Sequence, residues 1–469
     1  MKDKGKDKGG ALNPQILREY DIRGIVEEQF GADEAYLIGQ GYGTEVRRAG
    51  GQSVVVGYDG RLTSVALEKA LVEGLKSAGL RVLRVELGPS PMTYFASFYL
   101  ETDAAVMVTG SHNPASYNGF KLTLFKKPFF GDRIKALGRL IESGDFATGT
   151  GVVENCPIEE AYIDYLINDF KSHYAGAKPL KVIWDAGHGA VAEILKKLVQ
   201  KLPGTHILLN AQIDGTFPAH HPDPVVAENL EQLIEAVKTD RADLGFAFDG
   251  DGDRIGVIDD QGSIIWGDQL LVLLSREVLR TYPGATIIGD VKASQTLFDQ
   301  IEEMGGVPLM WRTGHSLIKA KMAETKAPLA GEMSGHIFFA DRHFGFDDAL
   351  YAALRTLGIV STGGDEKLSD WRKRLPHPLN TPEIRIGCSG HDKFSVIAHI
   401  RNALQNMQTP FIDIDGVRVL SEHGWWLLRA SNTAEELVVR VEAKNPAGLD
   451  ILKGELSAYL EKFGIPPLV

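Results

Sequence analysis

Three aspartates alternate with glycines in residues 249–253 (DGDGD), a spacing typical of a loop that binds a metal ion. Glycines between carboxylates let a short loop curl its oxygens around a hard cation, and oxygen ligands suit Mg²⁺. A calcium EF-hand also begins with alternating aspartates, but it requires glycine at position six and glutamate at position twelve. Those positions hold Arg254 and Asp260. We therefore predict a Mg²⁺ site at Asp249, Asp251 and Asp253 and reject a merely solvated acidic turn.

A serine stands directly after a predicted strand, in residues 109–114 (TGSHNP). Gly110 permits a tight turn that exposes Ser111, and Pro114 prevents the strand from continuing. The exposed hydroxyl could act as a nucleophile or carry a phosphate, although these residue types also form ordinary polar turns. A serine–histidine hydrolase is less well supported, because Ser111 is not flanked by the Gly-x-Ser-x-Gly pattern of that class.

A third loop, residues 331–336 (GEMSGH), carries hydrogen-bonding groups suited to the hydroxyls of a sugar. These groups are Glu332, Ser334 and His336, and the imidazole could also move a proton near neutral pH. A polar turn explains this loop equally well when it is taken alone.

A fourth loop, residues 429–433 (RASNT), could cradle a phosphate. One guanidinium, two hydroxyls, an amide and nearby backbone N–H groups are suitable donors. Their residues are Arg429, Ser431, Asn432 and Thr433. On this stretch alone a polar hairpin loop is an equal alternative.

Apolar runs of strand length alternate with amphipathic stretches and predict α/β architecture for most of the chain. Strands are expected at 53–58, 104–108 and 244–248, and a helix is expected at 64–77. A further helix is expected at 225–238, and a hairpin is expected at 411–420 around a central Asp-Gly pair. We predict three similar mixed-sheet α/β domains (1–157, 158–263 and 264–375) and a C-terminal α+β domain (376–469), placed around one central cleft.

Composition excludes several classes of protein. Of 469 residues, 44% are hydrophobic and 24% are charged, which is globular rather than disordered or fibrous composition. The net charge of −12 disfavours general binding of nucleic acid or of an anionic membrane. Two cysteines are too few for a disulfide framework, and the lysine-rich residues 1–10 lack the apolar core of a signal peptide. A soluble cytoplasmic protein with a frayed N-terminal tail is expected.

Together the four loops combine a reactive serine, a metal triad, a sugar-binding loop and a phosphate cradle. In this combination, from about residue 20 to residue 443, the chain resembles the α-D-phosphohexomutase family and its bacterial phosphomannomutase/phosphoglucomutase branch. The resemblance also includes residues 20–24 (YDIRG), 118–121 (NGFK), 214–218 (DGTFP), 220–224 (HHPDP), 290–292 (DVK) and 313–316 (TGHS).

The resemblance implies a reversible transfer of phosphoryl between O1 and O6 of mannose and glucose phosphates. A phosphorylated Ser111 would donate its phosphoryl and recover one from a hexose 1,6-bisphosphate intermediate, which also serves as activator. Mg²⁺ would be held by the three aspartates and the serine phosphate. Arg254 would lie on the transferring phosphoryl, and Lys121 and His336 would exchange protons. Further substrate contacts are implied at Tyr20, Arg23, Lys292, His315, Glu332, Ser334, Arg429, Ser431, Asn432 and Thr433.

Other functions stay open at this point. A phosphoglucosamine mutase would share the site, although that branch usually carries Gln where Met333 stands. A Mg²⁺-dependent sugar phosphatase would need the triad and serine but no remote phosphate cradle, and a non-catalytic phosphosugar-binding protein would need neither metal nor serine. A small phosphosugar partner and a monomeric state are expected, without nucleic acid or membrane.

Overall fold

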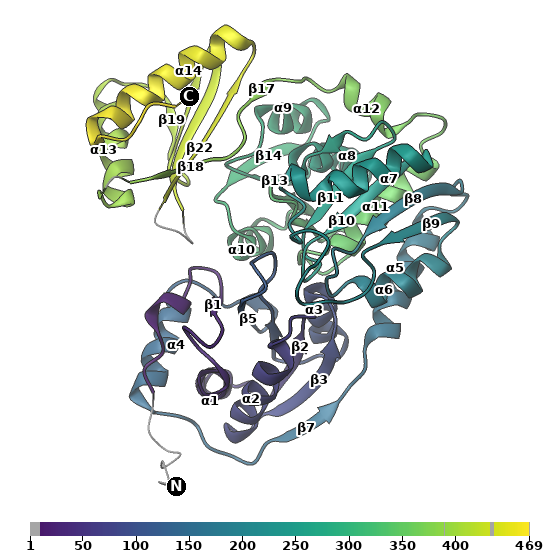
Figure 1. Ribbon diagram of the computed structural model, residues 1–469, viewed down its shortest axis with the longest axis vertical. Coiled ribbons are helices and arrows are strands. Elements are labelled where there is room, and N and C mark those ends of the chain that lie inside the picture. Colours follow the sequence, from purple (N-terminus) through teal and green to yellow (C-terminus); the bar gives the residue numbers. More distant parts are fainter. Residues whose placement is uncertain (1–9, 389, 432–435, 469) are drawn as a thin grey trace.

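The computed structural model describes residues 10–388, 390–431 and 436–468 and folds them into four units, each with its own β-sheet. Figure 1 shows the units arranged along a curve, so that the last unit lies across a gap from the first. Three sheets are mixed α/β and the fourth belongs to an α+β unit, so the predicted fold class is confirmed. The predicted domain boundaries near residues 157, 263 and 375 fall between helices and strands or at the end of one, and they remain predictions.

The first sheet has the order β1-β5-β4-β2-β3-β7, with β6 beside β5. Its strands are β1 (Ile22–Ile25), β2 (Ser53–Tyr58), β3 (Arg81–Leu87), β4 (Ala104–Val108), β5 (Tyr117–Leu124), β6 (Lys127–Pro128) and β7 (Val152–Asn155). Its helices are α1 (Ala32–Arg48), α2 (Ser64–Ser77), α3 (Ser90–Tyr99) and α4 (Asp132–Ser143). Strands β2 and β4 and helix α2 have the predicted bounds, because each carries a clear run or stripe of buried apolar residues.

The second sheet has the order β12-β11-β10-β8-β9. Its strands are β8 (Leu180–Asp185), β9 (Gly204–Leu209), β10 (Leu244–Phe248), β11 (Ile255–Asp259) and β12 (Ile264–Ile265), and its helices are α5 (Glu159–His173), α6 (Ala192–Leu198) and α7 (Glu231–Asp240). The helix expected from residue 225 instead begins at Glu231, after a 3₁₀ turn. The amide of Asn229 donates to the carbonyl of Asp223, and this local bond competes with α-helix formation.

The third sheet has the order β14-β13-β15-β16. Its strands are β13 (Thr286–Asp290), β14 (Val307–Trp311), β15 (Leu329–Gly331) and β16 (Ile337–Phe339). Its helices are α8 (Gly267–Thr281), α9 (Gln295–Glu303), α10 (His315–Thr325), α11 (Ala349–Thr362) and α12 (Leu368–Arg374). Strand β13 is parallel to β14 and β15, so the loops that follow these three strands leave the same edge of the sheet.

The fourth sheet is antiparallel, with the order β17-β22-β21-β20-β19 and β18 also beside β22. Its strands are β17 (Leu379–Asn380), β18 (Ile384–Gly387), β19 (Phe411–Ile412), β20 (Val417–Ser421), β21 (Gly424–Ala430) and β22 (Glu436–Ala443), and its helices are α13 (Lys393–Asn406) and α14 (Pro446–Leu460). The expected hairpin forms, but its loop is wider than predicted because β19 ends at Ile412. Asp415 in that loop instead bonds to groups outside the hairpin.

The hydrophobic core joins the first three units more closely than the fourth. One buried cluster runs through parts of the first, second and third units, from Val55 to Leu375. The fourth unit has a separate core between its sheet and its two helices. A small cluster of Val291, Trp425 and Leu427 links it to the third unit. Among the helices that the structure describes, none combines the length and apolar character needed to cross a membrane.

Candidate active site

The serine loop follows β4 and is held by residues of the loop after β2. Ser111 lies in the left-handed region with φ of 50° and is buried. The guanidinium of the buried Arg61 donates to the carbonyls of Pro114, Tyr117, Asn113 and Ser111 itself. The carboxylate of Asp59 accepts from the hydroxyl of Thr109 at 2.7 Å and pairs with Arg61. These buried charge-assisted bonds fix the conformation of the loop.

Two predicted loops from different units meet at the serine. The Ser111 hydroxyl donates to Oδ2 of Asp249 at 2.9 Å, although 138 residues separate them. The Ser111 hydroxyl also lies 3.2 Å from Nδ1 of His112. Burial together with the neighbouring carboxylates of Asp251 and Asp253 raises the pKa of Asp249 well above its ordinary value. The serine therefore stands directly beside the acidic triad.

The three aspartates form a buried, converging cluster. Asp249, Asp251 and Asp253 are fully buried, and one ligand atom from each lies within 4.8 Å of the others. Oδ1 of Asp251 and Oδ1 of Asp253 have no hydrogen-bond partner, which is costly for buried carboxylate oxygens. An all-oxygen set with unsatisfied atoms fits a hard divalent cation. The cluster can therefore hold the metal ion expected from the sequence.

Lys121 reaches this cluster from β5. Its ammonium lies 2.7 Å from Oδ2 of Asp251 and also contacts Asp253. Burial by itself would lower the pKa of Lys121, but these two carboxylates outweigh it and raise the pKa well above the ordinary value. Lys121 is thus protonated at the centre of the site. The hydroxyl of Ser90, at the start of α3, also contacts Asp251.

The sugar-binding loop predicted at residues 331–336 lies between β15 and β16, on the same side as the triad. Glu332 is buried and accepts from the backbone N–H of Gly314 at 2.5 Å. Burial raises the pKa of Glu332 above its ordinary value. Ser334 is partly exposed within the same loop.

His336, at the end of this loop, joins the second and third units. Nε of Arg254 donates to Nε2 of His336 at 3.0 Å, and the backbones of the two residues form a bridge. His315, the first residue of α10, stacks on His336 with ring centroids 5.5 Å apart. Burial lowers the pKa of His315 well below its ordinary value. Both imidazoles also face the buried carboxylate of Asp347.

Residues near the N-terminus close one side of the site. The hydroxyl of Tyr20 donates to the carbonyl of Thr313 at 2.8 Å, and its ring packs on Gly314. Arg23 donates to the side chain of Asn113 at 2.8 Å, next to the serine loop. Tyr20 therefore lies where the first and third units meet, and Arg23 lies beside the serine loop.

Two cations, one from the third unit and one from the fourth, pair with acidic side chains of the fourth unit. Arg429 donates to Asp415 at 3.1 Å, and the same Asp415 oxygen accepts from the backbone of Thr313. Lys292 lies 3.0 Å from Glu383, whose pKa is about 2 because Lys292 outweighs the effect of burial. Ser431, which directly follows β21, is buried. The predicted contacts Asn432 and Thr433 lie outside the described residues.

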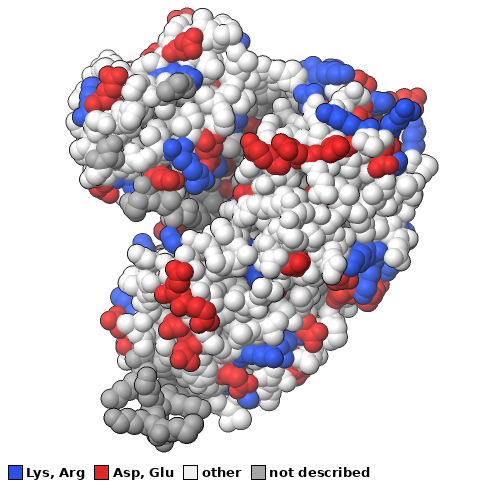
Figure 2. All heavy atoms as spheres, in the orientation of Figure 1, with Lys and Arg blue, Asp and Glu red and all other residues white. Residues whose placement is uncertain are grey.

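A cavity of about 300 Å³ brings seven of the predicted site residues together, while the triad, Lys292, Glu332, Ser334, Arg429 and Ser431 lie outside its lining. It is lined by Arg18, Tyr20, Asp21, Arg23, Ser111, His112, Asn113, Tyr117, Lys121, Arg254, His315, His336 and Arg385. Residues from all four units therefore face it. Figure 2 shows the surface hollowed between the fourth unit and the first. Among the charged lining residues, four arginines and one lysine outnumber a single aspartate although the whole chain is acidic, which suits an anionic phosphorylated ligand.

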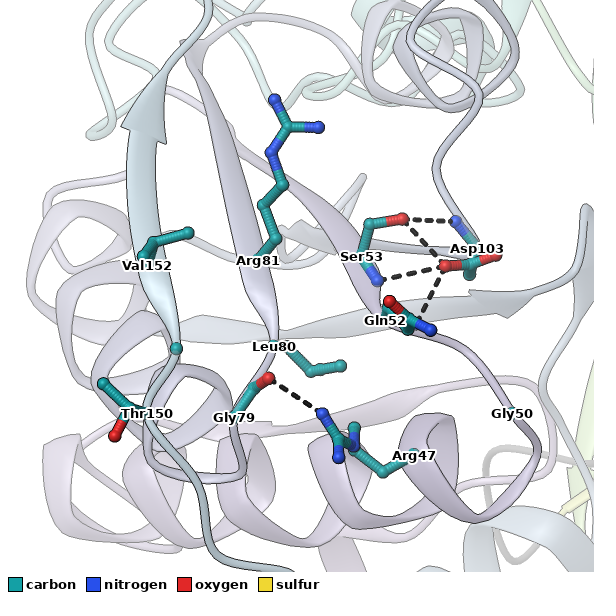
Figure 3. Close-up of a pocket in the computed structure, with 11 residues that line it drawn as sticks. Arg47, Gly50, Gln52, Ser53, Gly79, Leu80, Arg81, Asp103, Thr150 and Val152 are labelled. Carbon is teal, nitrogen blue, oxygen red and sulfur yellow. Dashed lines mark hydrogen bonds between the residues drawn. The ribbon is translucent and has the colours of Figure 1, made fainter.

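A larger cavity, of about 510 Å³, lies at the far end of the first sheet (Figure 3). Its polar groups already have partners. Asp103 accepts from the backbone of Gln52 and from Ser53, while Arg47 donates to the carbonyl of Gly79 and Arg81 pairs with Glu154. This cavity contains none of the predicted site residues, so the smaller one is the candidate active site.

Family comparisons agree with the geometry. Four family models match successive parts of the chain: phosphoglucomutase/phosphomannomutase α/β/α domain I at residues 14–147, domain II at 160–262, domain III at 266–379 and the C-terminal domain at 383–457. The chain belongs to the phosphoglucomutase/phosphomannomutase family. It is therefore an isomerase that transfers phosphoryl within its substrate.

Relatives of this family match nearly the whole chain. A phosphomannomutase/phosphoglucomutase from Pseudomonas aeruginosa is 44% identical over 95% of this chain and 95% of its own length. A phosphoglucomutase from Neisseria gonorrhoeae is 39% identical over 96% and 98%. A crystal structure of a phosphoglucomutase/phosphomannomutase family protein from Burkholderia thailandensis has a TM-score of 0.90 and 40% identity, covering 97% of this chain and all of that one. The match thus includes the arrangement of all four units.

Several residues of the site were not predicted from the sequence. Asp59 and Arg61 had one signal, a glycine-containing loop directly after a strand. Ser90, Asp347 and Glu383 had none, because their partners come from distant segments. Each of these three side chains contacts a residue that was predicted: Ser90 contacts Asp251, Asp347 contacts His336, and Glu383 contacts Lys292.

Proposed function

We propose that this enzyme reversibly moves a phosphoryl group between O1 and O6 of mannose and glucose phosphates. The observation that carries the proposal is the 2.9 Å bond from the Ser111 hydroxyl to Asp249, at a cavity whose lining comes from four units and includes four arginines and Lys121. Phosphoryl transfer depends mainly on positioning and charge neutralisation, and this cavity supplies both. The proposed substrate is a small phosphosugar.

Ser111 is the proposed carrier of the phosphoryl group. It gives the group to one end of a hexose phosphate, and the hexose 1,6-bisphosphate so formed returns the phosphoryl from its other end. The same bisphosphate, added in trace, would restore an unphosphorylated enzyme. Arg254 is the proposed contact of the phosphoryl in transit, and its position in the same cavity as Ser111 supports this role.

Asp249, Asp251 and Asp253 are the proposed ligands of Mg²⁺, together with the phosphate on Ser111. When bound, Mg²⁺ would neutralise part of the charge of ~−2 on that phosphate. The attacking sugar hydroxyl must lose a proton and later regain it. His336 is the proposed acceptor, and Lys121, protonated between two carboxylates, is a proposed donor.

The remaining residues bind the sugar and its second phosphate. Glu332 and Ser334 would hold two ring hydroxyls. Arg429, with Ser431, Asn432 and Thr433, would grip the phosphate that is not transferred, so that the sugar can turn over and present either end. Tyr20, Arg23, Lys292 and His315 complete the proposed contacts. We also propose that the protein is a monomer in the cytoplasm. Its proposed domain boundaries lie near residues 157, 263 and 375.

A coupled assay with mannose, glucose and glucosamine 1-phosphates, with and without trace hexose 1,6-bisphosphate, tests the proposal. We expect turnover of the first two, stimulation by bisphosphate, and a phosphate adduct at Ser111 in intact-mass spectra. Ser111→Ala should lose several orders of magnitude in turnover while its melting temperature changes little. Release of inorganic phosphate at the rate of isomerisation would instead indicate a phosphatase, and preference for the glucosamine substrate would reassign the sugar.

A further inference from the structure

Asp347 is a buried carboxylate that none of the proposed steps uses, yet it faces both histidines of the site. Its Oδ2 lies 3.1 Å from Nδ1 of His336 and 3.5 Å from Nδ1 of His315. Its Oδ1 accepts from the ammonium of Lys319 at 2.8 Å. One carboxylate therefore contacts three groups, and its own side chain is fully buried.

The backbone fixes Asp347 in this place. It pairs with Phe338 of β16 across an antiparallel bridge, which sets it beside the strand that follows His336. His315 and Lys319 stand one turn apart on α10, so both side chains reach the carboxylate from the same helix face. The ammonium of Lys319 balances the negative charge, which a buried carboxylate requires.

The contacts on the other side of His336 determine where its proton lies. Nε of Arg254 can only donate, so Nε2 of His336 must accept and carry no hydrogen. The hydrogen of a neutral imidazole is then on Nδ1, the atom that faces Asp347. Oδ2 of Asp347 is the nearest carboxylate oxygen to that hydrogen, at 3.1 Å from Nδ1, and both atoms are buried without another hydrogen-bond partner among the described residues.

A second carboxylate also lies near the imidazole of His336. Oδ1 of Asp253 lies 3.6 Å from the same Nδ1, farther than Asp347, and Asp253 belongs to the acidic triad. Asp253, His336 and Asp347 also lie close enough to share a cation. Lys319 already supplies a positive charge on Asp347, so orientation of the imidazole explains the cluster without a second metal.

We propose that Asp347 is a positioning residue that holds His336 in the tautomer with a bare Nε2, the atom that can accept the proton of the sugar hydroxyl. This inference rests on the proposed role of His336. When substrate binds, the hydroxyl would take the place of the Arg254 N–H at Nε2. Asp347 itself would touch neither the sugar nor the phosphoryl group.

Asp347→Asn tests the proposal, because an amide of the same shape can donate to Nδ1 and so favour the opposite tautomer. We expect kcat to fall by about 10²-fold or more while KM changes less than about threefold. In enzyme labelled with ¹⁵N-histidine, the His336 signals, assigned with His336→Gln, should shift from Nδ1–H to Nε2–H. Asp347→Glu should recover part of kcat and the original tautomer, and it serves as the test if the Asn variant does not fold.

Asp348→Asn is the matched control. The neighbouring Asp348 caps α11 and accepts from the hydroxyl of Tyr162, so its replacement should lower the melting temperature and leave kcat and the His336 signals near wild type. An Asp347→Asn enzyme with wild-type kcat, or with low kcat and an unchanged tautomer, overturns the inference. Full activity in His336→Gln would instead remove the proposed role of His336, and the inference with it.

Discussion

At the scale of residues, the site consists of buried charges that are neutralised by partners from other segments. Lys121 meets Asp251 and Asp253, Arg429 meets Asp415, and Lys292 meets Glu383. Such buried pairs are costly to break, because the remaining charge has no solvent to stabilise it. A phosphate group or a metal ion would offer these same groups new partners of opposite charge. Oδ1 of Asp251 and Oδ1 of Asp253 have no hydrogen-bond partner in the described part of the chain and would be available to such a metal ion.

Asp251→Asn should weaken metal binding. It removes one of three anionic oxygen donors and one of the two carboxylates that contact Lys121. We expect the Mg²⁺ concentration for half-maximal activity to rise at least about tenfold, which corresponds to ~1.4 kcal/mol, with partial recovery at high Mg²⁺. Magnesium titrations of activity measure it, with the surface variant Asp240→Asn as control. Wild-type activity that survives exhaustive chelation would refute the metal site.

His220 should make stability depend on pH. Its Nε2 lies 2.9 Å from the buried carboxylate of Asp185. Burial lowers the pKa of His220, but Asp185 outweighs it, so the pKa is raised above the ordinary 6.5. A group with a raised pKa in the folded state stabilises fully below its unfolded pKa, and this stabilisation is lost as the pH rises through the folded pKa.

We therefore expect His220→Gln to lower the melting temperature clearly at pH 6, with a deficit that shrinks towards pH 9. Thermal melts of both proteins across this range provide the measurement. His377→Gln, at an exposed histidine, should show a small difference at every pH. A deficit for His220→Gln that stays constant from pH 6 to pH 9 would mean that the ion pair does not contribute.

At the scale of elements, loops that follow parallel strands hold each other in place. The loop after β2 supplies Asp59 and Arg61, and the loop after β4 supplies Ser111. Strands β2 and β4 are hydrogen-bonded neighbours, so their carboxyl ends open side by side. Ser111 is therefore positioned by the sheet rather than by its own short sequence.

Arg61→Met should destabilise the first unit strongly. Arg61 bonds four carbonyls and neutralises Asp59, and removing one partner of a buried pair costs about 3–5 kcal/mol. Urea unfolding measures this loss, and phosphorylation of Ser111 by added bisphosphate should fall with it. The exposed Arg47 has one carbonyl partner, so Arg47→Met should cost less than about 1 kcal/mol.

A double-mutant cycle measures the interaction energy between Arg61 and Asp59. Combining Arg61→Met with Asp59→Asn should cost less than the sum of the two single changes, because no unpaired charge then remains. Equal costs for Arg61→Met and Arg47→Met would show that the serine loop does not depend on the guanidinium.

At the scale of the whole molecule, three units share one core and the fourth is attached separately. Arg418 donates to the carbonyls of Val291 and Ala293 and lies 3.7 Å from the ring centroid of Trp425. Figure 1 shows the fourth unit joined to the third and facing the first across the gap. Of the fourth unit's cations, Arg385 lines the cavity that also contains Ser111.

Arg429→Ala tests whether Arg429 orients the substrate without taking part in the breaking of the phosphate bond. Loss of an ionic hydrogen bond to the phosphate that is not transferred typically costs ~1.5–3 kcal/mol. We therefore expect kcat/KM to fall roughly ten- to a few-hundredfold. Because the bisphosphate loses one anchor, the variant should also need more added bisphosphate, while Ser111 still accepts phosphate from it. Lys444→Ala, on the exposed surface of the same unit, should match wild type in both measurements.

Unchanged efficiency and unchanged bisphosphate requirement in Arg429→Ala would mean that the fourth unit does not hold the distal phosphate. Lower efficiency without a greater requirement would place Arg429 on the reacting end instead. Steady-state assays at several bisphosphate concentrations, together with intact-mass measurement of Ser111, distinguish these outcomes.

The sequence alone determined the local features of this protein. Strand Ser53–Tyr58, helix Ser64–Ser77 and the DGDGD loop were recognisable because burial patterns and ligand spacing repeat within a few residues. The family followed from several such motifs in a fixed order. The helix expected from residue 225 was misplaced, since one bond between Asn229 and Asp223 outweighed the periodicity.

Only the tertiary structure decided which groups meet. Ser111 and Asp249 are 138 residues apart, and Asp347 stands in an unremarkable stretch between β16 and α11. Nothing in the spacing of Glu383 or Asp347 distinguishes them from ordinary surface acids, because spacing reports only neighbours along the chain. Their roles arise when separate sheets bring their loops to one cavity, where burial makes every charge need a partner.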